Sequence, residues 1–247
     1  MIYLALPSNN TTPSVNGSVL NATADKKLIL GKSDRSLLTY NFNVLWCNML
    51  NLRHTHDIRW FCMLHTDIEI KTDNWLDVLI ESAVKSKADI LSIVSPIKDS
   101  RGLTSTALID TETNCVVKRL VMKEVCLLPP VFDITDIKNI LGIDTANKIL
   151  GVNTGVMLVK VADWCESILF SQKDYIIKTT DTTGHKTFEA QTLSEDWLFS
   201  IDAHKLGVTV KACRNVHIKH YGNTGYNNYG SWGDLDADDL QDNYIEA

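Results

Sequence analysis

Features that define several common protein classes are missing from this 247-residue chain. No apolar run approaches the roughly 18 residues that a membrane-spanning helix needs. The six cysteines include no Cys-x-x-Cys pair, and several lie inside apolar runs, as reduced core thiols do. The opening "MIYLALPSNN" has neither the charged start nor the long apolar stretch of a signal peptide. We therefore expect a cytoplasmic protein with no membrane partner.

Three short motifs that mark large enzyme classes are also absent. The chain has no Gly-x-x-x-x-Gly-Lys loop and no Gly-x-Gly-x-x-Gly fingerprint, which removes the main support for a kinase or a dinucleotide-binding enzyme. A Gly-x-Ser-x-Gly turn, on which a Ser-His-Asp hydrolase displays its nucleophile, is missing as well.

The net charge of −6 says little about partners, because the acidic excess is local. The last 14 residues contain six acidic and no basic side chains, so the rest has 24 basic against 30 − 6 = 24 acidic. We divide the chain into one domain, residues 1–233, and an acidic C-terminal tail, residues 234–247. No repeat and no linker rich in proline or glycine divides the domain further.

Apolar runs and helical patterns alternate through the first hundred residues, which predicts parallel strands with helices on both faces. Continuous apolar runs, typical of buried strands, predict strands at residues 1–7, 26–31, 58–64 and 88–95. Apolar spacing predicts helices at residues 36–50, 73–86 (with Asp73 as N-cap), 162–170 and 192–207. A polar loop is expected up to about residue 25, and a second polar stretch lies at residues 171–191. The later sequence also predicts a hairpin at residues 102–121 and strands at 154–161 and within 208–222.

Polar residues follow two of these predicted strands directly. In "FCMLHTDIEI", residues 61–70, an apolar strand runs into His65, Thr66 and Asp67 with no turn residue between. Ligands of open α/β sheets bind beyond the carboxyl ends of strands, where a carboxylate can hold a cation that bridges phosphates. Spacing alone leaves Asp67 as a cation ligand or as a turn cap.

The second of these strands, predicted at residues 88–95, is followed by both basic and acidic side chains. In "SPIKDSRGLTST", residues 95–106, Lys98 and Arg101 are candidates to offset a diphosphate, and Asp99 is a candidate to hold a sugar hydroxyl. A solvated loop is the alternative.

The stretch "FCMLHTDIEIKTDNWLDVLI" resembles the GT-A glycosyltransferases, in which an apolar strand ends in an Asp-x-Asp motif before a Trp-Leu helix. Asp67 stands at the second, metal-binding Asp of that motif, and His65 stands at the first. The resemblance implies that Asp67 binds Mn²⁺ or Mg²⁺ and that His65 and Thr66 lie at a nucleotide-sugar donor, a UDP-sugar by family frequency. A role for His65 as a ligand to Mn²⁺ stays open.

Three later segments continue the resemblance in the family's order, so that it covers residues 60–222. "NTGVMLVKVADW" is similar to the strand before the acceptor site and adds Asn153 and Gly155 to the predicted donor site. "SEDWLFSIDAHKLGVTV" resembles the helix that carries the catalytic base. "VHIKHYG" resembles the closing strand, whose last histidine, His220, would be a metal ligand. The implied fold is a single α/β domain of Rossmann type, with a mixed sheet flanked by helices.

Glu195 and Asp196 are the candidate catalytic carboxylates. Thr192 and Glu195 also match a capping box, which assigns Glu195 to the helix start and leaves Asp196 as the better base. The helix dipole favours an ionised Asp196, and an anionic base that takes the proton of an acceptor hydroxyl fits an inverting displacement. A surface carboxylate is the alternative.

The acceptor is open at this point. The chain looks similar to small glycosyltransferases of bacteriophages, some of which modify hydroxymethylated pyrimidines in DNA, and this would place it in the host cytoplasm. DNA needs a basic surface, for which the candidates are Lys98, Arg101, Lys118, Arg119 and Lys123. A saccharide or protein acceptor, a non-catalytic nucleotide- or sugar-binding module of the same fold, and a nucleotidyltransferase are the alternatives. The aromatic segment 220–234 fits either a mobile lid or an ordered coil.

Overall fold

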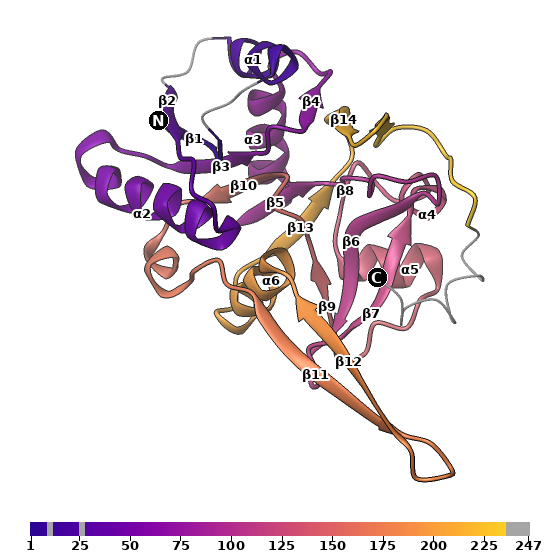
Figure 1. The fold of residues 1–247 in the computed structure, drawn as a ribbon. Coiled ribbons are helices and arrows are strands. Elements are labelled where there is room, and N and C mark those ends of the chain that lie inside the picture. The colour runs from indigo at the N-terminus through magenta and orange to yellow at the C-terminus, as the bar shows by residue number, and fades with distance from the viewer. Residues whose placement is uncertain (9–11, 25–27, 236–247) are drawn as a thin grey trace.

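The computed structural model describes residues 1–8, 12–24 and 28–235, and its centre is a seven-stranded sheet (Figure 1). In their order across the sheet, the strands are β2 (Leu28–Lys32), β1 (Ile2–Leu6), β3 (Trp60–Leu64), β10 (Val156–Lys160), β5 (Ile90–Ile93), β13 (Val210–Cys213) and β8 (Val131–Phe132). β1 is parallel to β2 and β3, and β13 is parallel to β5, whereas β10 runs antiparallel between β3 and β5. The sheet is therefore mixed, and its strands from the first hundred residues all run in one direction, as the alternation predicts.

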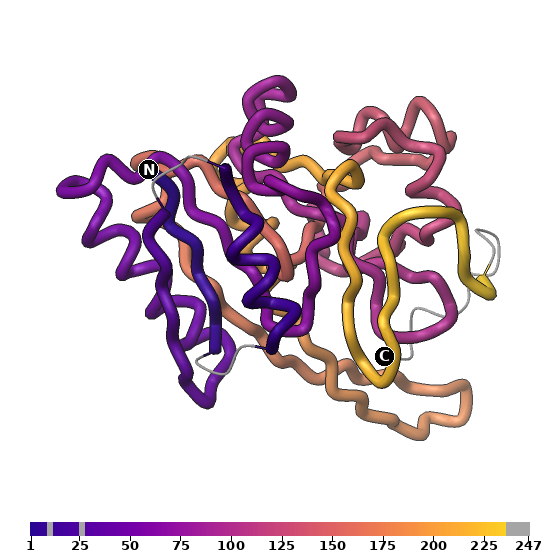
Figure 2. Tube along the Cα trace, turned by 90° about the horizontal axis from the view of Figure 1, so that it is seen from above, coloured from indigo at the N-terminus to yellow at the C-terminus, as the bar shows by residue number. Residues whose placement is uncertain are grey.

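Helices cover both faces of this sheet (Figures 1 and 2). One face packs against α2 (Leu38–His56), α4 (Met122–Val125), α5 (Ile134–Leu141) and α6 (Glu195–Lys205), and the other against α1 (Pro13–Leu20) and α3 (Trp75–Ser86).

The two faces explain why β3 is apolar at almost every position. Phe61 and Met63 join the core under α2, whereas Cys62 and Leu64 join the core under α3. A strand buried on both sides needs apolar side chains in both directions.

Smaller sheets surround the central one. A three-stranded sheet contains β15 (Gly225–Asn227), β14 (Ile218–Tyr221) and β4 (Ile68–Ile70), and a second contains β7 (Val116–Val121), β6 (Leu103–Asp110) and β9 (Lys148–Gly151). β6 and β7 confirm the predicted hairpin. A long hairpin of β11 (Lys173–Thr180) and β12 (Lys186–Leu193) extends away from the body of the molecule (Figure 1).

Two elements lie where polar sequence gave no periodic signal. α1 occupies the stretch that was expected to be a loop, and its N-cap is Thr12, whose side chain accepts a hydrogen bond from the backbone N–H of Val15. Residues 171–191 supply most of the β11–β12 hairpin, whose side chains are exposed on both faces except near its base.

Several predicted helix boundaries were wrong. The helix predicted to end at residue 50 continues to His56, α3 is preceded by Asn74 rather than Asp73, and residues 162–170 contain only a short 3₁₀ helix, Asp163–Ser167. The capping box is wrong as well. Thr192 still belongs to β12 and donates to Asp174, so that α6 begins at Glu195 after Ser194.

The predicted acidic tail falls mostly on residues 236–247, which lie outside the described residues. Within the part of the chain that the structure describes, no helix combines the length and apolar character needed to cross a membrane.

Candidate functional site

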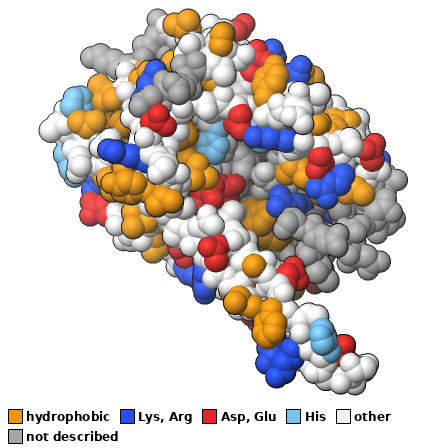
Figure 3. Space-filling model, viewed as in Figure 1, with side chains coloured by type: hydrophobic (Ala, Val, Ile, Leu, Met, Phe, Trp, Pro, Cys, Tyr) orange, Lys and Arg blue, Asp and Glu red, His pale blue; other side chains and the backbone are white. Residues whose placement is uncertain are grey.

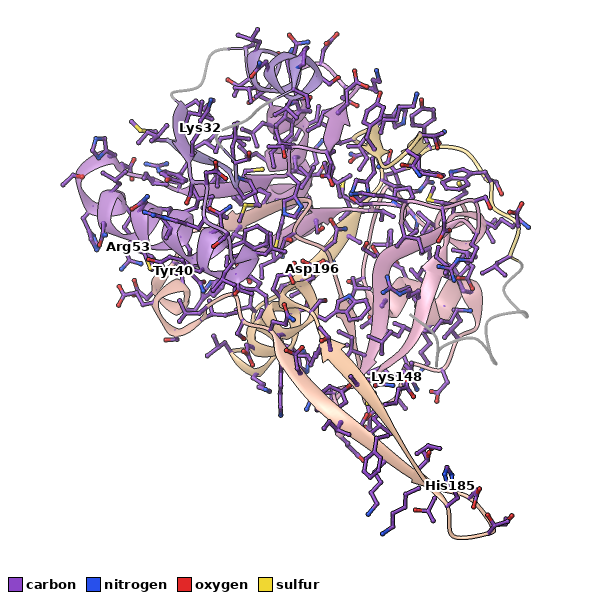
Figure 4. The ribbon with its side chains drawn as sticks, viewed as in Figure 1. Lys32, Tyr40, Arg53, Lys148, His185 and Asp196 are labelled. Carbon is purple, nitrogen blue, oxygen red and sulfur yellow. The ribbon has the colours of Figure 1, made fainter. Side chains whose placement is uncertain are left out.

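Polar residues from several segments meet in a hollow near the middle of the molecule. Figure 3 shows a histidine in this hollow, with acidic and basic side chains around it. Figure 4 labels Asp196 in the same central region, at the start of α6 and far from His185 on the hairpin. The segments that contribute follow β3 and β5, precede β10, and include β14 and the first turn of α6.

Asp67, Lys98 and His220 form one charged cluster. The Asp67 Oδ2 atom accepts a hydrogen bond from Lys98 Nζ at 2.5 Å and lies 3.4 Å from His220 Nε2. β14 brings His220 to this position, because it pairs antiparallel with β4 in the register His220↔Ile68. Lys98 and His220, each more than 30 residues from Asp67 in the sequence, therefore both contact Asp67.

The electrostatics of Asp67 follow from these contacts. Burial alone would raise the pKa of Asp67, but hydrogen bonds from His220 and Lys98 outweigh it and hold the pKa well below its usual range. Asp67 is therefore an anion at any physiological pH. It also lines a cavity of about 380 Å³ that Thr66 and α1 help to enclose.

Two features of this cluster suit a divalent cation. Among the residues that the structure describes, no group donates to the buried Asp67 Oδ1, so one carboxylate oxygen is left for an additional ligand. His220 Nδ1 lies 2.7 Å from the Pro96 carbonyl, and because a carbonyl only accepts, Nδ1 carries a proton. Nε2, the nitrogen that faces Asp67, is therefore the atom through which His220 would bind a cation in place of the proton that it donates to Asp67.

Two other features limit that fit. Lys98 already supplies a positive charge at Asp67. Within residues 1–8, 12–24 and 28–235, no three or more His, Cys, Asp or Glu side chains are arranged around one metal position. Asp67 and His220 therefore fit a cation that takes its other ligands from a bound diphosphate or from water.

Asp196 lies in a different environment, at the first turn of α6. Its Oδ1 accepts from the Thr154 hydroxyl at 2.6 Å and from the Thr154 backbone N–H at 3.3 Å. Burial, reinforced by the neighbouring Glu195 carboxylate, raises the pKa of Asp196 to about 7. A carboxylate with this pKa can accept a proton at neutral pH, which suits a general base.

The loop between β9 and β10 holds Thr154 against α6. The backbone N–H of Val152 donates to Ser200 Oγ on α6 at 3.1 Å. The Asn153 side chain is buried and bridges the Ile93 carbonyl and the Gly155 N–H, at 2.9 Å and 3.0 Å. Asn153 therefore stabilises the loop itself, and its contact with a donor stays a prediction.

His65 connects the two carboxylate environments. Its Nε2 lies 3.3 Å from Thr154 Oγ1, and its backbone N–H donates to the Gly155 carbonyl at 2.8 Å. Burial lowers the pKa of His65 to about 4, against a smaller opposite effect of Asp67, so the ring is neutral.

The other predicted residues have partners of their own. Arg101 and Asp99 pair with each other through Nη2 and Oδ2 at 2.8 Å. Lys118 forms an ion pair with Glu124, and Arg119 lies over the Trp197 ring.

The aromatic segment 220–234 contains the end of β14 and all of β15, and its aromatic side chains have contacts within and beside it; a role as a lid stays a prediction. Tyr226 stacks on Trp232 with ring centroids 5.9 Å apart, and Trp232 Nε1 donates to the Asn227 carbonyl. Tyr221 donates its hydroxyl to Glu69.

Sequence reasoning missed Thr154, although it joins His65 to Asp196. The available signal was its position between Asn153 and Gly155, in a loop already assigned to the site. Nothing in the spacing indicated that its hydroxyl would face a helix more than 40 residues later.

Comparison with known proteins supports the fold only. No protein-family model and no curated protein matches this sequence. Among solved structures, A197 from STIV superposes with a TM-score of 0.51, covering 90% of this chain and 85% of that one at 13% sequence identity. Its fold is glycosyltransferase-like. At this identity the likeness is one of architecture and transfers no activity.

Proposed function

We propose that this protein is a glycosyltransferase that moves a sugar from a nucleotide-sugar, in the first instance a UDP-sugar, to an acceptor hydroxyl with inversion. The observation that carries the proposal is the chain of contacts Asp196–Thr154–His65, which ends two residues before Asp67. At one end of this chain lies Asp196, a carboxylate suited to accept a proton. Near the other end lies Asp67, a carboxylate suited to hold a positive charge beside a diphosphate. The likeness in fold to a glycosyltransferase-like viral protein supports the same conclusion.

In this proposal Asp196 takes the proton of the acceptor hydroxyl while that oxygen bonds to the anomeric carbon of the sugar. The bond from this carbon to the diphosphate breaks, and its electron pair leaves with the diphosphate. Lys98, which pairs with Asp67, would offset part of the departing charge. Asp67 and His220 would hold Mn²⁺ or Mg²⁺, which supplies electrostatic stabilisation of the leaving group when bound.

The first experiment measures thermal unfolding with UDP-, GDP-, ADP- and TDP-sugars, each with and without Mn²⁺. We expect one nucleotide to raise the Tm in a Mn²⁺-dependent manner, because a ligand that binds only the folded state stabilises it. Asp67→Asn should abolish the rise. Asp57→Asn, at an exposed turn, is the matched control and should retain it. Equal responses of the wild type and Asp67→Asn would contradict the donor site.

A saccharide or protein is the acceptor we favour over DNA. The basic surface that DNA needs is largely neutralised, because Lys98, Arg101 and Lys118 pair with carboxylates and Arg119 lies over an aromatic ring. A hydroxymethylated pyrimidine stays an alternative prediction. An assay for the released nucleoside diphosphate, with pyrophosphate measured in parallel, separates transfer of a sugar from transfer of a nucleotide.

A second candidate function is a nucleotide- or sugar-binding module without turnover. The Lys98–Asp67 ion pair favours it, because an internal cation already neutralises the carboxylate that would otherwise bind metal. Tight nucleotide binding that needs no metal, together with no transfer to any acceptor, would support this function.

A further inference from the structure

The histidine that replaces the first Asp of the expected motif bonds away from the charged cluster, to Thr154. His65 Nε2 and Thr154 Oγ1 are 3.3 Å apart, and Thr154 Oγ1 and Asp196 Oδ1 are 2.6 Å apart. One hydroxyl therefore lies between the imidazole and the candidate base.

The direction of these hydrogen bonds follows from the number of protons. Thr154 has a single hydroxyl proton, and when Asp196 is ionised, the state in which it can act as a base, the short contact to its carboxylate uses that proton, since an ionised carboxylate only accepts. The Thr154 oxygen is then left to accept, and the proton of the second bond comes from His65 Nε2–H. The chain therefore runs from His65 to Thr154 to Asp196, with each group donating to the next.

His65 is held rigidly enough to serve this purpose. Its backbone N–H donates to the carbonyl of Gly155, next to Thr154, at 2.8 Å. Its ring packs against Phe42 at a centroid distance of 5.1 Å. The same residue thus ties the end of β3 to the loop and orients the Thr154 hydroxyl.

We propose that His65 is a positioning residue for Asp196, which acts through Thr154, and that it is neither a cation ligand nor a donor contact. This inference rests on the proposed function, in which Asp196 is the base. It gives a physical reason for histidine at this position. An aspartate at position 65 would be a second acceptor for the single Thr154 proton and would compete with Asp196 for it.

The test is a double-mutant cycle between His65→Leu and Thr154→Val, with His65→Gln and Thr154→Ser as conservative variants that keep a donor and a hydroxyl. The first measurement is the carboxyl pKa of Asp196 by ¹³C NMR, assigned with Asp196→Asn. It needs no turnover. Glu195, on the same helix, raises the pKa of Asp196 directly, whereas His65 would affect it through Thr154. Glu195→Gln is therefore measured as the reference for a direct effect on that pKa. The second measurement is kcat against pH, and the third is the affinity for UDP with Mn²⁺.

We expect Thr154→Val to raise the carboxyl pKa of Asp196 by about one pH unit, because a hydrogen bond to the charged form is lost. His65→Leu should raise it in the same direction by less, and the double variant should match Thr154→Val alone. His65→Gln and Thr154→Ser should stay close to the wild type, and UDP affinity should change less than about twofold in His65→Leu.

Two results would overturn the inference. One is an Asp196 pKa that does not move in folded His65→Leu. The other is a loss of Mn²⁺-dependent UDP binding in His65→Gln, which would make His65 a ligand. If the wild type transfers no sugar while the NMR coupling is present, the proposed function fails and the His65–Thr154–Asp196 linkage stands.

Discussion

At the scale of single residues, Asp67 and Asp196 show how surroundings divide two identical side chains into different roles. Asp67 accepts from Lys98 and lies beside His220, so its pKa is held low and it stays an anion. Asp196 is buried and lies beside another carboxylate, and these two effects outweigh the hydrogen bonds from Thr154, so its pKa rises to about 7. Carboxylates with pKa values separated in this way are typical of sites that use one as a fixed charge and one as a proton acceptor.

The raised pKa of Asp196 predicts an acid limb in the rate of transfer. Below pH 7 the carboxyl is increasingly protonated and cannot accept a proton, so kcat should fall about tenfold for each further pH unit. Asp196→Asn should lower kcat by about 10² to 10⁴-fold and remove this limb. Initial rates between about pH 5 and 9 measure both effects. Asp202→Asn, on the same helix but paired with Lys205, is the control and should keep the profile.

The Lys98–Asp67 ion pair predicts competition between the ammonium group and a metal ion. Lys98→Met removes a positive charge 2.5 Å from Asp67 Oδ2, so Mn²⁺ should bind the free protein about tenfold more tightly in a calorimetric titration. Binding of UDP without metal should weaken in the same variant. Lys85→Met, which removes an exposed partner of Glu81 on α3, should change neither affinity. A Mn²⁺ affinity that Lys98→Met leaves unaltered would contradict the competition.

At the scale of elements, the loop of residues 152–155, between β9 and β10, links the main sheet to the start of α6. Gly155 is needed there because a Cβ atom at this position would lie 2.7 Å from Ile68 Cδ1 and 2.9 Å from Asn153 Oδ1. Gly155→Ala should therefore lower the free energy of unfolding by about 1 to 3 kcal/mol, measured by urea denaturation. Gly17→Ala, in α1 with no atom within 4 Å of the new Cβ, should be stabilising by about 0.5 to 1 kcal/mol. Equal effects of the two changes would refute the steric argument.

The elements differ in how far the sequence predicts them, and burial is the reason. β3 and β5 are buried on both sides, and their continuous apolar runs were sufficient to locate them. β11 and β12 pair mainly with each other and expose Ile176 and Phe188, so their composition has no buried face to reveal a strand. The start of α6 was misplaced because Thr192 and Glu195 fit a local capping pattern that the longer β12 strand overrides.

At the scale of the whole molecule, the order of the strands in the central sheet determines which residues meet at the site. β10 inserts between β3 and β5, and this brings the Thr154 loop beside His65, 89 residues away in sequence. Sequence analysis could select Asp67 as a polar residue at a strand end, and the family resemblance added Asp196 and His220. It could not pair them with Lys98 and Thr154, because those contacts depend on long-range packing that no local pattern encodes.

The charge distribution of the whole molecule predicts weak binding to DNA. The net charge is −6, and three of the five cations proposed for a DNA surface pair with carboxylates. Nonspecific DNA binding depends on cations that neutralise phosphates, so we expect a Kd above about 10⁻⁵ M for a hydroxymethylcytosine duplex at about 0.15 M salt by fluorescence anisotropy. A Kd below about 10⁻⁶ M that weakens steeply with salt would restore DNA as the acceptor. An unmodified duplex is the control, because equal affinity for both would indicate backbone contacts rather than recognition of the hydroxyl that is to be glycosylated.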